Sequence, residues 1–162
     1  MLVQAIGTTH FDRVKASIDQ CGNGTRPHEL ASALTTAAMI GDTIALGLLL
    51  DRGADPKARD KTGRTALIEA VFGGHKDAVE LLLRRGAEVN GQDADGWTAL
   101  MEAASKGRTE IVKQLLAHGA DVYISSDNGC TAFRVAARGN CELVTLLRLA
   151  SGSIPNLSNG GA

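Results

Sequence analysis

Aromatic residues make up only 3% of this chain, with one Trp, one Tyr and three Phe among 162 residues. This scarcity argues against a sandwich or barrel core. The three cysteines are odd in number and lack Cys-x-x-Cys spacing, which indicates reduced thiols rather than a disulfide framework or a zinc site. No long apolar run is present, so neither a secretion signal nor a membrane span is visible. We therefore expect a cytoplasmic or nuclear protein that does not bind membranes.

The chain also has no excess of positive or negative charge, because it contains 17 basic and 18 acidic residues. A formal net charge of -1 provides no field that would attract nucleic acid, and we predict no nucleic-acid partner. Phosphate-binding glycine loops are absent, and no two histidines fall at metal-ligand spacing. The sequence therefore predicts no cofactor and no metal.

The chain does contain an internal repeat with a period of 33 residues. Gly63, Gly96 and Gly129 keep this interval, and a threonine follows each of them two positions later. Matching glycine, alanine and leucine positions extend the pattern to an earlier copy, and to a last copy whose register shifts by one residue after Arg138. Identical residues at a fixed period are typical of an array that folds by stacking rather than around one central core.

Each repeat predicts two short helices led by a tight turn. The opening phrases Asp-Lys-Thr-Gly (60–63), Asp-Ala-Asp-Gly (93–96) and Ser-Asp-Asn-Gly (126–129) suit a type I turn. The threonine that follows can cap a first helix with small inward residues, and a glycine near the middle of the repeat can end that helix. Leucines at helical spacing then predict a second helix, which is too short to be stable without its neighbours.

Several phrases resemble the ankyrin repeat family: Asp-Gly-Trp-Thr-Ala-Leu (95–100), Gly-His (74–75), Glu-Ile-Val (110–112) and Leu-Leu-Ala-His-Gly-Ala-Asp-Val (115–122). The resemblance spans nearly the whole chain at that family's own period. It implies an all-α ankyrin-repeat solenoid of helix-turn-helix pairs linked by β-hairpin-like turns, and a structural hydrogen bond for His75. Where the family has Thr-Pro-Leu-His, this chain has Thr-Ala-Leu-Ile at 65–68. The helix start therefore lacks the backbone geometry that a proline would preset.

We predict one ankyrin-repeat domain over 1–150 and a flexible tail over 151–162. The parts of the domain are a degenerate N-terminal capping repeat at 1–27, repeats at 28–59, 60–92 and 93–125, and a C-terminal capping repeat at 126–150.

Polar residues stand at both ends where other repeats have inward leucines, with Ser17 in the first repeat and Arg148 in the last. We therefore expect solvent-exposed outer faces at both ends and a complete array. The last helix is nevertheless rich in leucine. Either Ile154 and Leu157 fold back over it or a second chain covers it, and we expect a monomer.

No catalytic group stands out. Glu69 and Glu102 occupy matching positions, and a residue that recurs once per repeat usually serves the fold, whereas a catalytic acid needs a unique and enclosed setting. Cys130 and Cys141 have no basic partner at meaningful spacing. We predict that the protein is not an enzyme.

The surface that remains for function is a concave face made of the turn tips and the exposed side of each first helix. Equivalent positions on it differ between repeats, as expected of a surface that recognises a partner. Trp97 is the leading candidate, because it presents a large rigid ring with one N–H donor, although packing on the preceding turn is the alternative. The predicted partner-binding residues are Met39, Ile40, Lys61, Arg64, Phe72, Asp95, Trp97, Ser105, Lys106, Asp127, Cys130 and Arg138.

We expect a non-catalytic module that binds a protein or peptide on this face, with Met39, Phe72 and Trp97 as apolar anchors and Arg64 and Lys106 setting its charge preference. For Phe72 and the Met39/Ile40 pair the alternative is partial burial between first helices. For Lys61, Arg64 and Lys106 the alternative is that they are isolated, solvated charges. A stoichiometric inhibitor of one enzyme or transcription factor is an alternative function. A structural spacer within a larger protein is another.

Overall fold

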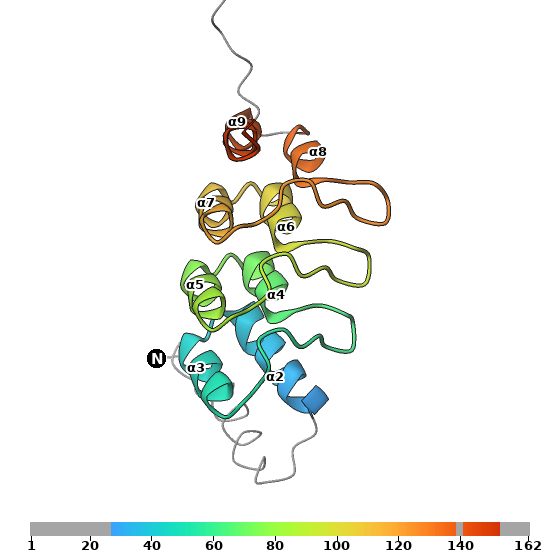
Figure 1. Cartoon of the computed structure of the whole chain (residues 1–162). Coiled ribbons are helices and arrows are strands. Elements are labelled where there is room, and N and C mark those ends of the chain that lie inside the picture. The colour runs from blue at the N-terminus through green and yellow to red at the C-terminus, as the bar shows by residue number, and fades with distance from the viewer. Residues whose placement is uncertain (1–26, 139–140, 153–162) are drawn as a thin grey trace, which may run out of the picture.

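The computed structural model describes residues 27–138 and 141–152, and these residues form a stack of helical pairs (Figure 1). The helices are α2 (Pro27–Ile40), α3 (Thr43–Asp51), α4 (Ala66–Gly73), α5 (Lys76–Arg84), α6 (Ala99–Ser105), α7 (Thr109–Ala117), α8 (Ala132–Ala136) and α9 (Cys141–Ala150). The prediction of an all-α solenoid of helix-turn-helix pairs is confirmed for the described residues.

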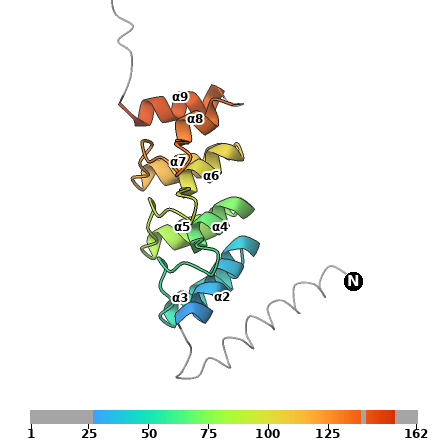
Figure 2. The same ribbon diagram turned by 90° about the vertical axis from the view of Figure 1, so that its right-hand side faces the viewer.

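The helices stand in two columns that run along the stack. The first helices α2, α4, α6 and α8 contact one another in that order, and the second helices α3, α5, α7 and α9 form a parallel column (Figure 1). Figure 2 shows the same layers from the side, with each pair lying on the one before it. The first helix of one repeat is therefore a neighbour of residues about 33 positions away, which is what brings distant residues together on one face.

Threonine caps begin the first helices as predicted. The Oγ1 atoms of Thr65, Thr98 and Thr131 each accept a hydrogen bond from the backbone N–H three residues later, at 3.3 Å. All three residues have extended backbone dihedrals just before the helix. A side-chain oxygen at this position satisfies a donor that the helix itself cannot, so the threonines fix where each first helix starts.

The predicted turns lie between the repeats and point away from both columns, as three hairpins closed by the antiparallel bridges Arg59↔Thr65, Gln92↔Thr98 and Ser125↔Thr131. The hairpins also contact one another, because the backbone N–H of Asp127 donates to the carbonyl oxygen of Asp95 at 3.1 Å.

Asp60 holds the first of these turns through its carboxylate. Its Oδ1 accepts hydrogen bonds from Thr62 N (2.8 Å), Thr62 Oγ1 (2.6 Å) and Arg64 N (3.0 Å). Partial burial by itself would raise the pKa of Asp60, but these hydrogen bonds and the charge of Arg64 outweigh it and lower the pKa below its ordinary value of 3.8. The turn is therefore held by an ionised carboxylate at neutral pH.

The core runs continuously along the stack between the two columns. It consists mainly of leucine and alanine, and Leu67, Leu82, Leu100 and Leu115 are almost completely buried. Alanines at the inward positions of the first helices are buried as well, and their small size lets adjacent helices approach closely. The low aromatic content thus fits the way this core is built.

The leucines of the last helix differ in their exposure. Leu143 and Leu147 are buried against the preceding repeat and Leu146 is partly buried, so Leu149, at 58% exposure, is the one leucine of α9 that is largely exposed. Arg148 is exposed as predicted, and its guanidinium carbon lies 5.6 Å from the centre of the Phe133 ring.

Several predictions fall outside the described residues. They concern the N-terminal capping repeat before Pro27, including Ser17, and the tail from residue 153 onward, including the contacts expected of Ile154 and Leu157. The described part of the last repeat places α8 and α9 against α6 and α7.

Candidate functional site

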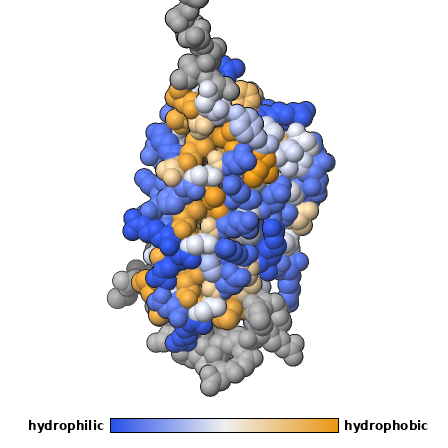
Figure 3. All heavy atoms as spheres, in the orientation of Figure 1, coloured by the Kyte–Doolittle hydropathy of each residue, from blue (hydrophilic) through white to orange (hydrophobic). Residues whose placement is uncertain are grey.

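The predicted partner-binding residues lie at the hairpins and at the C-terminal ends of the first helices. We call this set of residues the candidate face. Its exposed members are Met39, Ile40, Lys61, Phe72, Asp95, Ser105, Lys106, Asp127 and Arg138, and its partly buried members are Arg64, Trp97 and Cys130. In Figure 3 apolar residues gather in a band along the stack over the helices, and hydrophilic residues cover most of the hairpin side.

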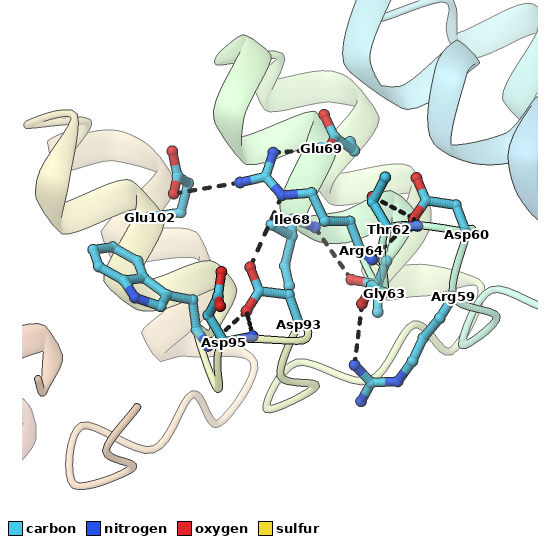
Figure 4. A network of polar contacts seen from close by, with 12 residues as sticks. Arg59, Asp60, Thr62, Gly63, Arg64, Ile68, Glu69, Asp93, Asp95 and Glu102 are labelled. Carbon is cyan, nitrogen blue, oxygen red and sulfur yellow. Dashed lines mark hydrogen bonds and ion pairs between the residues drawn. The ribbon is translucent and has the colours of Figure 1, made fainter. Parts of the chain in front are cut away.

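Arg64 is the centre of a polar network that joins two repeats (Figure 4). Its Nη1 donates to Oε1 of Glu69 in the same repeat at 2.8 Å. Its Nη2 lies 3.9 Å from Oε2 of Glu102, and its Nε lies 3.9 Å from Oδ2 of Asp93, both in the next repeat. One guanidinium therefore serves three carboxylates on two layers of the stack.

Two carboxylates of this network are buried, which distinguishes it from an ion pair on the surface. Glu69 and Glu102 are only 8% and 7% exposed, so each carboxylate needs a partner to offset its lost hydration. Burial would lower the pKa of Arg64, but the hydrogen bond to Glu69 and the charges of Glu69, Glu102 and Asp93 raise it above its ordinary value. The two glutamates thus serve the fold, which is the role expected of residues that recur once per repeat.

Phe72 lies beside this network and contacts two cations. Its ring centre is 5.3 Å from the guanidinium carbon of Arg64 and 4.5 Å from Nζ of Lys106, which belongs to the next repeat. Both distances are within the range of cation–π attraction. The interpretation of Arg64 as an isolated, solvated charge is therefore wrong, since it contacts carboxylates of two repeats. Lys106 is exposed to solvent and lies over the Phe72 ring of the preceding repeat.

The equivalent positions one repeat further on carry different residues. Arg64 is replaced by Trp97 and then by Cys130, while Phe72 is replaced by Ser105 and then by Arg138. Because Ser105 and Cys130 are small, they leave a hollow between repeat 93–125, here called the third repeat, and repeat 126–150, the fourth. This pocket has a volume of about 260 Å³ and is lined by Trp97, Ser105, Cys130, Arg134, Val135 and Arg138.

Trp97 is buried only in part, and contact with a partner stays a prediction for it. Its side chain is partly buried and packs against the core, and the same side chain lines the pocket. Arg134 and Val135 were not among the predicted site residues. Comparison of equivalent positions would have found them, because Arg134 stands where Ile68 and Met101 are buried and Val135 stands where Glu69 and Glu102 are buried.

Adjacent repeats are also tied where the first helices end. Nε2 of His75 donates to the carbonyl oxygen of Met39 at 3.0 Å, which agrees with the structural hydrogen bond implied by the resemblance. Arg108, at the equivalent position of the next repeat, donates from Nη2 to the carbonyl oxygen of Phe72 at 3.1 Å. Such bonds satisfy carbonyl groups that a helix leaves unpaired at its C-terminus. Sequence reasoning missed Arg108, because arginine replaces histidine there.

The structure offers no cluster for metal chemistry in the part of the chain it describes. Within residues 27–138 and 141–152, no group of three or more His, Cys, Asp or Glu side chains could hold a metal ion. Over the same residues, no helix has both the length and the apolar character needed to cross a bilayer.

Stacked helical pairs joined by projecting hairpins define a helical repeat solenoid, a class that builds extended surfaces. A family model described as ankyrin repeats (3 copies) matches residues 2–93 and 86–159. The chain belongs to the ankyrin repeat family. Ankyrin repeats are generally protein–protein interaction modules and generally non-catalytic. A search of curated proteins finds no match.

Proposed function

We propose that this protein is a non-catalytic module that binds a protein or peptide partner on the candidate face. The observation that carries this proposal is the series of large apolar side chains at that face. Met39 and Phe72 are exposed at equivalent positions of successive repeats, and in the next repeat Trp97 is partly buried at the position equivalent to Arg64. Exposed apolar residues that lie together among polar ones are typical of interaction sites, and aromatic residues contribute strongly to binding.

The network around Arg64 supports the same proposal in a different way. Because Arg64 is held by carboxylates of two repeats, it fixes the position of Phe72 instead of remaining free for a partner. An anchor that is already held in place loses less conformational entropy on binding. Arg64 therefore acts by organising the face, and direct charge contacts are left to other cations.

The test is affinity capture from an extract of the source cells with the wild type and with the double variant Phe72→Ala/Trp97→Ala. We expect the variant to bind a captured partner about tenfold more weakly or worse, because two aromatic anchors are removed. The control is Leu149→Ala, which removes an exposed apolar side chain from α9, in the other column of helices. Unchanged affinity of the double variant, with its helix content intact, would exclude this face as the binding site.

The number of captured proteins separates the alternatives. One dominant partner whose activity falls when the chain is added indicates a stoichiometric inhibitor, whereas several partners indicate a scaffold. A chain that captures nothing through this face would agree with a structural spacer.

A further inference from the structure

The pocket between the third and fourth repeats differs in charge from the rest of the candidate face. Around Phe72, the cation Arg64 is matched by the carboxylates of Glu69, Asp93 and Glu102. In the pocket, Arg134 and Arg138 are the charged residues, and the position equivalent to the two buried glutamates carries Val135. The acids that recur in the earlier repeats are therefore missing where two cations are present.

Both arginines keep donors for a ligand. Nη1 of Arg134 donates to the carbonyl oxygen of Gly129 at 3.2 Å, which leaves most of its five N–H donors unused by that bond. Neither Arg134 nor Arg138 forms an ion pair with a carboxylate of the described residues. Two guanidinium groups without an internal acid attract a carboxylate, which arginine binds through paired, directed hydrogen bonds.

The remaining lining of the pocket is apolar or small. Trp97 and Val135 provide hydrophobic surface, and Ser105 and Cys130 provide space. A volume of about 260 Å³ lies just below the usual range of small-molecule sites, so the pocket suits one or two side chains rather than a cofactor.

We propose that this pocket receives an Asp or Glu side chain of a peptide segment of the partner, with the carboxylate on Arg134 and Arg138 and an adjacent apolar side chain on Trp97. This inference rests on the proposed function and specifies the partner's chemistry at one point of the same face. Both arginines are exposed, so a carboxylate contributes to specificity through charge-assisted hydrogen bonds that an amide or a cation at the same place does not form.

The experiment begins with selection of random peptides displayed on phage against the wild-type chain. We expect the selected peptides to share an Asp or Glu next to an apolar residue. A synthetic selected peptide should bind at least about tenfold more tightly than the same peptide with that acid changed to Gln or Asn. A version with phosphoserine in place of the acid identifies the source of the anion, and tighter binding of the phosphopeptide would overturn the proposal.

Matched variants locate the contact. Arg134→Gln/Arg138→Gln should remove the preference for the acidic peptide over its amide version, whereas Arg84→Gln/Arg85→Gln removes the same charge from the end of α5 and should preserve the preference. Circular dichroism checks that both variants keep their helices. An acid preference that persists in Arg134→Gln/Arg138→Gln would overturn the proposal.

Cys130 provides a second readout, because it lines the pocket and the thiol reacts with maleimide only where reagent can reach it. In a Cys21→Ser/Cys141→Ser background, the bound acidic peptide should slow labelling of Cys130 about tenfold. Unchanged labelling under saturating peptide would place the peptide elsewhere.

The outcomes separate this inference from the proposed function. Peptides that bind through Phe72 and Trp97 but show no acid preference leave the proposed function standing and overturn the assignment of the pocket. Failure of the wild-type chain to select any peptide counts against both.

Discussion

Arg64 shows how one side chain can connect layers of a repeat protein. Its planar guanidinium has donors pointing in several directions, so it can bind Glu69 in its own repeat while it attracts Glu102 and Asp93 in the next. Exposed ion pairs contribute little to stability, but here two of the carboxylates are buried. Loss of the cation would leave them without an offset for their desolvation.

We predict that Arg64→Gln lowers the free energy of unfolding by about 1–3 kcal/mol, because it leaves buried carboxylates unpaired. Arg64→Lys should lose less, since it keeps the charge without the fork of donors. Urea denaturation measures both. In a Glu69→Gln/Glu102→Gln background, Arg64→Gln should lower the free energy of unfolding by less. A loss below about 0.5 kcal/mol in the wild-type background would contradict this account.

The junction between the two helices of a repeat depends on a contact with the next repeat. Gly74 ends α4 with a φ of 81°, a left-handed conformation that favours glycine. A Cβ atom at this position would collide with the guanidinium of Arg108, which binds the carbonyl oxygen of Phe72. The glycine therefore provides both the turn and the space for the neighbouring side chain.

Gly74→Ala and Gly86→Ala form a matched pair, because Gly86 has a φ of 86° but a Cβ there would meet no atom within 4 Å. We expect Gly86→Ala to cost about 1–2 kcal/mol from backbone strain alone. Gly74→Ala should cost more, because Arg108 must also move and give up its hydrogen bond. Thermal or urea unfolding measures the difference, which should disappear in an Arg108→Ala background. Equal costs in the wild-type background would show that the Arg108 contact does not contribute.

The whole molecule is stabilised by contacts between neighbouring repeats. Helix α7 contacts α5, α6 and α9, whereas α9 contacts α7 and α8 among the described helices. Stability in such arrays is approximately a sum of repeat and interface contributions, so the effect of a substitution depends on where in the stack it lies.

Leu115 in α7 and Leu147 in α9 are both almost completely buried and allow a matched comparison. Deleting a buried leucine side chain typically costs about 2–5 kcal/mol. We expect Leu115→Ala to weaken protection of amides in α5 to α9, and Leu147→Ala to raise amide exchange mainly in α8 and α9. Native-state hydrogen exchange measures both patterns. If Leu147→Ala accelerated exchange equally in α4 and α9, the stack would be one indivisible unit.

Local features of the fold follow from residues that are close in sequence. The threonine caps and the glycines at helix ends act over a few residues and recur with the 33-residue period. The structure confirms the helices and hairpins that they predict. For Met39 and Phe72 the sequence left exposure and partial burial between first helices as alternatives, and the structure has both exposed. Binding of a partner by these residues stays a prediction.

What the sequence by itself determined is therefore the architecture, because caps, turns and apolar spacing operate within one repeat. The tertiary structure decided which side chains meet between repeats: Arg64 reaches Glu102, and Ser105 and Cys130 leave a pocket beside Trp97. Those contacts depend on the separation of the stacked helices and on the sizes of residues about 33 positions apart. Only stacking brings such residues within contact distance of each other.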